Sequence, residues 1–245
     1  MAVDILGQEW DSISGCTKIS AGCKHCYAER MTEWHLKKGT SKYQAGFHKV
    51  VCHERELRVP LKRKTPQTYF VNSMADTFHK DVPLEFIQKL YKVMNDCPQH
   101  TFQVLTKRSD RMLETVTSLN YSENIWLGVS VEREDCVYRI EHLQQTPARI
   151  KFVMFEPLVG PVGTLDLTGI DWTIVGGESG DGWRKMEIDW VREIRDQCLS
   201  AGVKFVFKQF AGFNPEPLGR MLDGVLWDER PLFEWERNRF AHNSG

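Results

Sequence analysis

The stretch IWLGVSVEREDCVYRIEHLQQTPARIKFVMF, residues 125–155, holds an apolar run, an amphipathic segment and a second apolar run in that order. The two runs, 125–131 and 150–155, are nearly continuous in apolar residues, which is typical of strands buried on both faces of a parallel sheet. Three apolar residues recur between them at helical spacing: Val137, Ile140 and Leu143. Strand, helix and strand in this order predict a βαβ unit and an α/β fold.

The same alternation continues on both sides of this stretch. Further apolar runs that predict strands occupy residues 10–14, 68–73, 101–106, 171–177 and 203–210. Apolar residues at helical spacing lie at 27–34, 86–94, 112–119 and 191–198, with Asp189 as the expected N-cap of the last helix. Seven strands in this rhythm predict a single-domain, complete or partial TIM-like (β/α) barrel with mainly parallel strands.

Two segments interrupt the rhythm without dividing the chain. We expect residues 1–245 to form one domain, with an insertion near 37–64 and an irregular cap near 212–245. The insertion is polar and basic, whereas the cap carries aromatic residues among many charges: Trp227, Phe233, Trp235 and Phe240.

Composition limits the classes of function. The 245 residues carry a formal net charge of −1, which gives no general attraction to nucleic acid or membrane. No stretch approaches the roughly 20 apolar residues of a membrane span, and no signal peptide is visible. We therefore expect a soluble, cytoplasmic protein whose seven cysteines stay reduced and are free to bind metal.

Polar residues gather where the predicted strands end. In parallel α/β sheets the ligand lies beyond the carboxyl ends of the strands, so we expect a polar site at this rim. A strand must also end in some polar loop, which accounts for part of the pattern. The candidate site residues are Asp76, Lys107, Ser130, Glu132, Glu156, Glu178 and Lys208.

Three cysteines follow the first predicted strand at the spacing C-x6-C-x2-C: Cys16, Cys23 and Cys26. Thiolates suit soft metals, and three of them on one tight loop converge on one centre. Gly15 and Gly22 flank these cysteines, and we expect them to let the backbone bend closely around an inorganic core.

The spacing leaves three interpretations open. A structural zinc needs a fourth ligand, which His25, His48 or Cys52 would supply. Incidental cysteines would need no ligand at all, although their density is high. A [4Fe–4S] cluster would use three protein ligands and leave one iron open for a substrate or cofactor. The position of the loop, at the expected catalytic face of a barrel, favours the cluster.

The cysteine motif resembles that of a phage and bacterial family of uncharacterised proteins, which carries GC-x6-C-x2-CYAE near the N-terminus. Seven further segments match that family: VNSMADTFH, VLTKRSDRM, WLGVSVE, FEPLVGPV, VGGESG, FKQFAG and GRMLDGVLWDERP. The family is in turn similar to radical S-adenosylmethionine (SAM) enzymes, in which a cysteine triad follows the first strand of a partial or complete barrel.

The resemblance implies that the three cysteines bind a [4Fe–4S] cluster and that SAM chelates its open iron. Reduction would then cleave SAM into methionine and a 5′-deoxyadenosyl radical. Asp76 would receive the SAM amino group, Lys107 and Arg108 its carboxylate or a substrate phosphate, and Ser130 and Glu132 the ribose hydroxyls. The chain departs from the usual C-x3-C-x2-C spacing, and Ser73-Met74-Ala75-Asp76 replaces the usual Gly-Gly-Glu.

The substrate is left open as a small molecule or nucleotide, and the chemistry requires an electron donor. Stacking residues and cations that would fit a nucleotide or single-stranded nucleic acid are Trp183, Trp227, Arg184, Lys185, Arg220 and Arg230. The alternative function is a zinc-binding structural barrel that binds a nucleotide without radical chemistry.

Overall fold

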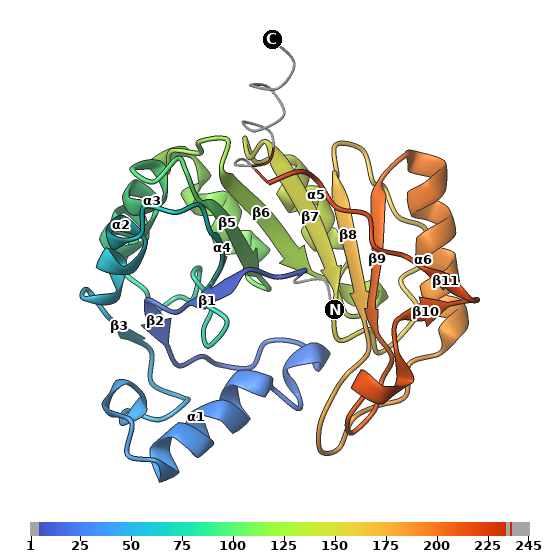
Figure 1. Ribbon diagram of the computed structural model, residues 1–245, viewed down its shortest axis with the longest axis horizontal. Helices are drawn as coiled ribbons and strands as arrows, with labels where there is room; N and C mark the ends of the chain where they lie inside the picture. Colours follow the sequence, from blue (N-terminus) through green and yellow to red (C-terminus); the bar gives the residue numbers. More distant parts are fainter. Residues whose placement is uncertain (1–4, 234–235, 237–245) are drawn as a thin grey trace.

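The computed structural model describes residues 5–233 and 236. In this part of the chain, seven strands form one sheet whose spatial order follows the sequence. The strands are β1 (Gln8–Trp10), β4 (Thr68–Val71), β5 (Thr101–Thr106), β6 (Ile125–Ser130), β7 (Ile150–Phe155), β8 (Trp172–Gly176) and β9 (Lys204–Gln209). Every neighbouring pair is parallel. The sheet curls into an open half-barrel with β1 and β9 at its edges, so the predicted α/β class and partial barrel are confirmed (Figure 1).

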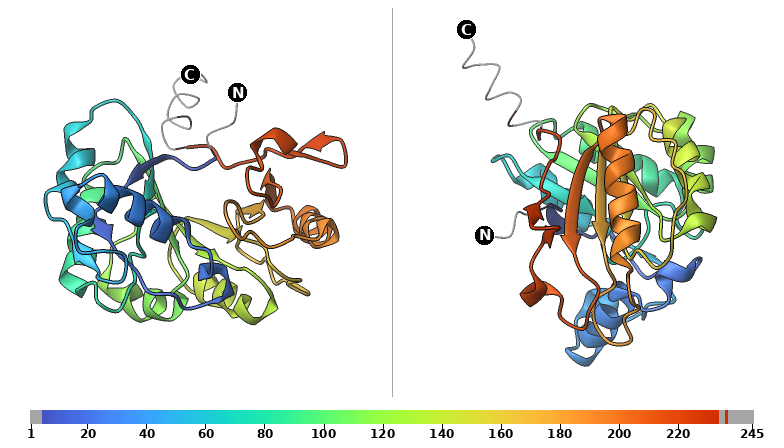
Figure 2. Two further views of the ribbon diagram at one scale, coloured as in Figure 1. Left: turned by 90° about the horizontal axis from the view of Figure 1, so that it is seen from below. Right: turned by 90° about the vertical axis from the view of Figure 1, so that its right-hand side faces the viewer.

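Four helices cover the convex face of the sheet, and the largest core lies between the two layers (Figure 2). They are α3 (Leu84–Asn95), α4 (Ser109–Thr115), α5 (Tyr138–Gln144) and α6 (Ile188–Ala201). Short 3-10 turns accompany them at η4 (Val116–Ser118) and η5 (Glu134–Cys136). Asp189 lies inside α6 and pairs with Arg192, so the expectation that it caps the helix is wrong by two residues.

The concave face is apolar at the amino-terminal ends of the strands. Trp126 of β6 packs there with Trp172 and stacks on Phe233, whose ring centroid lies 5.4 Å away. The Trp172 indole donates a hydrogen bond to the Glu229 carbonyl at 2.9 Å. Within the described residues, the chain after β9 therefore closes this end of the half-barrel and leaves the carboxyl ends of the strands open to a ligand.

The rest of that C-terminal segment flanks β9. It forms η6 (Glu216–Leu218) and an antiparallel hairpin of β10 (Met221–Leu222) and β11 (Val225–Leu226). Trp227 then packs edge-on against Phe205 of the core. Of the aromatic residues expected in the cap, Trp235 and Phe240 lie outside the described residues.

Helix α1 (Tyr27–Lys37) stands apart from the outer layer, beside the carboxyl ends of the strands (Figures 1 and 2). Its buried residues are Ala28 and Thr32, whereas Tyr27 and Trp34 are half exposed. Of the apolar face expected from Tyr27, Met31 and Trp34, only Met31 packs: with Ala28 it contacts a small core that contains Tyr43, Phe47 and Met74. None of the described helices is both long enough and apolar enough to cross a membrane.

The connection at 37–64 packs against the segment near residues 13–16. It contains η2 (Ser41–Tyr43), β3 (Val51–Cys52), η3 (Glu56–Arg58) and α2 (Val59–Lys62). Strand β3 pairs antiparallel with β2 (Ile13–Ser14), which has left the main sheet. The first strand expected at 10–14 is thus wrong in extent. The Asn72 side chain explains the departure, because it accepts hydrogen bonds from the backbone N–H groups of Ser12 and Ile13 at 2.9 and 3.1 Å.

Candidate metal and cofactor site

The cysteine loop connects the end of β2 to α1. Gly15 starts it in a left-handed conformation, with φ of 84°, and η1 (Ala21–Cys23) forms its far end. The Cys16 backbone N–H donates to the Phe47 carbonyl at 2.7 Å. A β-carbon on Gly15 would also overlap the Lys49 backbone. The 37–64 connection therefore sets the path of the loop.

Glu132 supports the loop from the other side. Its carboxylate accepts hydrogen bonds from the Ser20 hydroxyl and from Arg139, the latter at 2.8 Å. Burial raises the pKa of Glu132, but the charges of Lys107 and Arg139 outweigh it and leave the pKa below its ordinary value. A β-carbon on Gly22 would overlap the Glu132 side chain. Gly22 thus permits close packing against Glu132, a different reason from the expected bend around an inorganic core.

Cys16, Cys23 and Cys26 line one pocket of about 190 Å³. It lies at the carboxyl ends of β4, β5 and β6, and its wall includes Asp76 and Ser130. Burial raises the pKa of Cys16 to about 11, while the charge of Arg108 lowers it and that of Asp76 raises it. A metal that binds to this thiol must therefore displace a proton. The three cysteines singled out by their spacing are therefore brought together.

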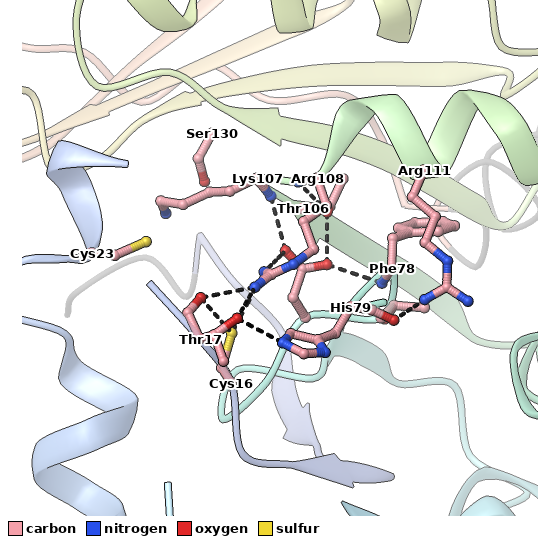
Figure 3. Close-up of polar contacts among 12 residues, drawn as sticks. Cys16, Thr17, Cys23, Phe78, His79, Thr106, Lys107, Arg108, Arg111 and Ser130 are labelled. Carbon is pink, nitrogen blue, oxygen red and sulfur yellow. Dashed lines mark hydrogen bonds and ion pairs between the residues drawn. The ribbon is translucent and has the colours of Figure 1, made fainter. Parts of the chain in front are cut away.

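Asp76 lies at the centre of a hydrogen-bond network on the wall of this pocket, and its partners are labelled in Figure 3: Phe78, Thr106, Lys107 and Arg108. One carboxylate oxygen accepts from the Thr106 hydroxyl and the Phe78 N–H, at 2.7 and 2.9 Å. The other accepts from the Lys107 N–H and the Arg108 guanidinium, both at 3.1 Å. Both oxygens are thus engaged by the protein itself.

A larger cavity of about 570 Å³ adjoins the cysteine pocket and shares part of its lining, including Cys23, Lys107 and Ser130. The Ser130 hydroxyl is buried without a hydrogen-bond partner among the described residues. No ion pair involving the Lys107 ammonium group occurs in the same part of the chain. Figure 3 shows both side chains on the Cys23 side of the network. They form a donor set that suits an anionic or hydroxyl-bearing ligand.

Farther along the rim, Glu156, directly after β7, and Lys208 of β9 line this cavity. The Lys208 ammonium donates to both carboxylate oxygens of Glu156, at 2.7 and 2.9 Å. Gly176 of β8 lies between the two strands, and a β-carbon there would come within 3.2 Å of Glu156. The pair presents a donor and an acceptor to a ligand while adding no net charge.

Glu178 joins the loop after β8 to the cysteine loop. It accepts hydrogen bonds from Arg184 Nε at 2.8 Å and contacts His25 Nδ1 at 3.1 Å. Burial raises the pKa of Glu178, but the hydrogen bonds from Arg184 and His25 outweigh it and lower the pKa overall. Arg184 also donates to the Ala21 carbonyl at 2.9 Å. Glu178 therefore holds one wall of the cavity together as well as lining it.

None of the residues expected as a fourth ligand for zinc lines the cysteine pocket in the described part of the chain. His25 contacts Glu178, exposed His48 lies 3.6 Å from Glu29, and Cys52 packs against the main core. Across residues 5–233 and 236, no group of three or more His, Cys, Asp or Glu side chains has the geometry of a single-ion site. In an iron–sulfur cluster each thiolate binds a different iron, so its sulfurs stand apart around the inorganic core. Thiolates are the usual ligands of such clusters, and three thiols line this pocket.

The residues expected to bind a nucleotide do not form one patch. Trp183 is partly exposed in the loop near the cavity, whereas Trp227 is partly buried and packs against the main core. The associated cations pair separately: Lys185 with Glu187, Arg220 with Asp228, and Arg230 with Glu236.

The cavity residues that the sequence did not identify include Glu9, Tyr27, Arg30 and Phe70. Glu9 and Phe70 are register partners on β1 and β4, so strand alternation around the inward positions could have found them. Tyr27 and Arg30 are three residues apart on α1, which places them on one face of the helix.

The fold and the site together define an α/β half-barrel protein with a thiol-lined ligand pocket at the carboxyl ends of its strands. The chain belongs to the DUF5131 family, whose description is 'protein of unknown function'. The family model matches residues 2–231. No curated protein and no solved structure matches the chain.

Proposed function

We propose that the protein is a radical SAM-type enzyme whose [4Fe–4S] cluster is bound by Cys16, Cys23 and Cys26. One observation carries this proposal: three thiols from an eleven-residue segment line a single pocket that adjoins a much larger cavity. A purely structural metal site has no need of an adjoining cavity, whereas a reactive centre needs space for a ligand beside it.

The bound cluster would supply one electron to SAM, and cleavage of SAM would start radical chemistry on a substrate. The chain's own part is to bind and orient the two ligands. Lys107 and Ser130, which border both cavities, suit the polar amino-acid end of SAM. Glu156 and Lys208 lie farther along the large cavity and suit the ribose or the substrate.

Two candidate residues take a different role in this proposal. Asp76 and Glu132 were expected to touch SAM, but their carboxylates are occupied by Arg108 and Arg139 respectively. Glu178, which Arg184 engages, can both line the cavity and hold its wall. We therefore assign Asp76 and Glu132 to the support of the cysteine loop and leave Glu178 as a ligand-facing residue.

The proposal predicts that Cys16→Ala, Cys23→Ala and Cys26→Ala each abolish cluster binding. Cys97→Ala is the matched control, because Cys97 is buried in the main core away from the pocket. Iron and acid-labile sulfide are measured after anaerobic purification and reconstitution. We expect about four of each per chain in the wild type and the control, and a loss of most of both in the other variants.

Undiminished iron in the Cys23 variant would refute the ligand assignment. One zinc ion per chain without sulfide would refute the enzyme proposal and support the structural zinc protein. The variants His25→Ala, His48→Ala and Cys52→Ala separate the two cases further, because only the zinc alternative needs a fourth protein ligand and one of these three residues would have to supply it.

A further inference from the structure

We infer that Arg108 is a positioning residue that raises the reduction potential of the cluster by holding a cation and an N–H donor against the Cys16 sulfur. The inference rests on the proposed function and concerns Cys16, whose sulfur accepts a hydrogen bond from an arginine. Arg108 Nη1 lies 3.5 Å from Cys16 Sγ and donates to it. The guanidinium therefore contacts the sulfur directly, and its positive charge contributes to the electrostatic potential at any metal that Cys16 binds.

The rest of the guanidinium is fixed to the same loop. Nη2 donates to the Thr17 carbonyl at 2.8 Å and to its hydroxyl at 3.1 Å (Figure 3). The Thr17 hydroxyl in turn contacts His79 Nε2 at 2.8 Å. Because planar guanidinium donors fit several acceptors at once, the head group has one well-defined place beside Cys16.

Asp76 completes the arrangement from the opposite side. It accepts a hydrogen bond from Arg108 Nη1 at 3.1 Å. The pair is nearly buried, because the Asp76 side chain is 8% exposed and the Arg108 side chain 11% exposed. Arg108 also donates its backbone N–H to Thr106 Oγ1 at 2.8 Å. The side chain and backbone of Arg108 are therefore held before any cluster binds, which keeps the donor aimed at the sulfur.

The expected effect follows from charge. Reduction adds an electron to the cluster, and part of that negative charge resides on the cysteine sulfurs. A nearby cation and an N–H···S hydrogen bond stabilise the reduced state more than the oxidised state. Asp76 offsets part of the cation's charge, but it is the guanidinium that touches the sulfur.

A matched control lies one helical turn away. Arg111 is also partly buried, and its guanidinium donates to the carbonyls of His79 and Val82. Figure 3 shows Arg111 on the far side of His79 from Cys16. The same substitution at Arg111 therefore disturbs the neighbouring structure without touching a thiol.

The test compares Arg108→Lys, Arg108→Met and Arg111→Lys with the wild type, each reconstituted anaerobically without SAM. Iron and sulfide are counted first, and the midpoint potential is then measured by a redox titration followed by electron paramagnetic resonance. We expect a negative shift for Arg108→Met and a smaller negative shift for Arg108→Lys, which keeps the charge but loses the forked donors. Arg111→Lys should keep the wild-type potential.

Cluster-loaded Arg108 variants with the wild-type potential would overturn the inference. The inference would also be overturned if both Arg108 variants failed to bind iron while Arg111→Lys bound it, because the role of Arg108 would then be only to hold the cysteine loop in place. If the wild type itself binds no iron and sulfide, the proposed function fails, and that result is distinct from either of these.

Discussion

At the scale of single residues, the site separates groups that face a ligand from groups that hold the loop. The Lys107 ammonium and the Ser130 hydroxyl line the cavity without an ion-pair or hydrogen-bond partner among the described residues. The carboxylates of Glu132 and Asp76, by contrast, pair with arginines. All four follow or end a strand in sequence, so position along the chain cannot separate them. What separates them is the partner that the fold brings in from another element.

Replacement of Glu132 by Ala should lower the free energy of unfolding by about 3–5 kcal/mol, because it leaves the buried guanidinium of Arg139 without its ion pair. The matched control is Glu123→Ala. Glu123 pairs with Arg149 on the surface, where loss of a pair costs about 0–1 kcal/mol. Chemical denaturation of both variants measures the two effects. Equal, small losses would contradict the buried support role of Glu132.

At the scale of elements, the strands were largely predictable. Continuous apolar runs placed β5 and β7 at their observed bounds, since both faces of those strands are buried. The first strand was not predictable in extent, because the Asn72 side chain from a distant turn ends it. The packing of α1 was predictable only in part, because helical spacing identifies an apolar face but not which of its residues another element covers: Met31 packs on a small core, whereas Tyr27 and Trp34 stay half exposed.

The loop after β8 should loosen in acid through Glu178. Its pKa is lowered in the folded state, so ionised Glu178 stabilises the fold fully above the ordinary value of 4.5. That contribution is lost as the pH falls through the lower, folded-state pKa. Unfolding free energies of the wild type and Glu178→Gln, measured from pH 7 to pH 3, should therefore differ most at neutral pH and converge in acid. A difference that does not change with pH would contradict this account.

At the scale of the whole molecule, the half-barrel is closed at the amino-terminal ends of its strands, and the candidate site lies at their carboxyl ends. Phe233 and Trp126 fill the amino-terminal end, while α1 and the cysteine loop cover part of the carboxyl end. The sequence predicted the rim and the cysteine triad. It did not predict how completely the 37–64 connection shapes the loop, because the contacts at Phe47 and Lys49 are made through the backbone.

The most direct test of the central claim is the release of 5′-deoxyadenosine. Cluster-loaded wild-type protein is incubated anaerobically with dithionite and SAM, with Cys23→Ala as the control, and the products are separated by chromatography. We expect 5′-deoxyadenosine and methionine from the wild type and neither from the control. A wild-type protein with an intact cluster that releases no 5′-deoxyadenosine would contradict the assignment to radical SAM chemistry.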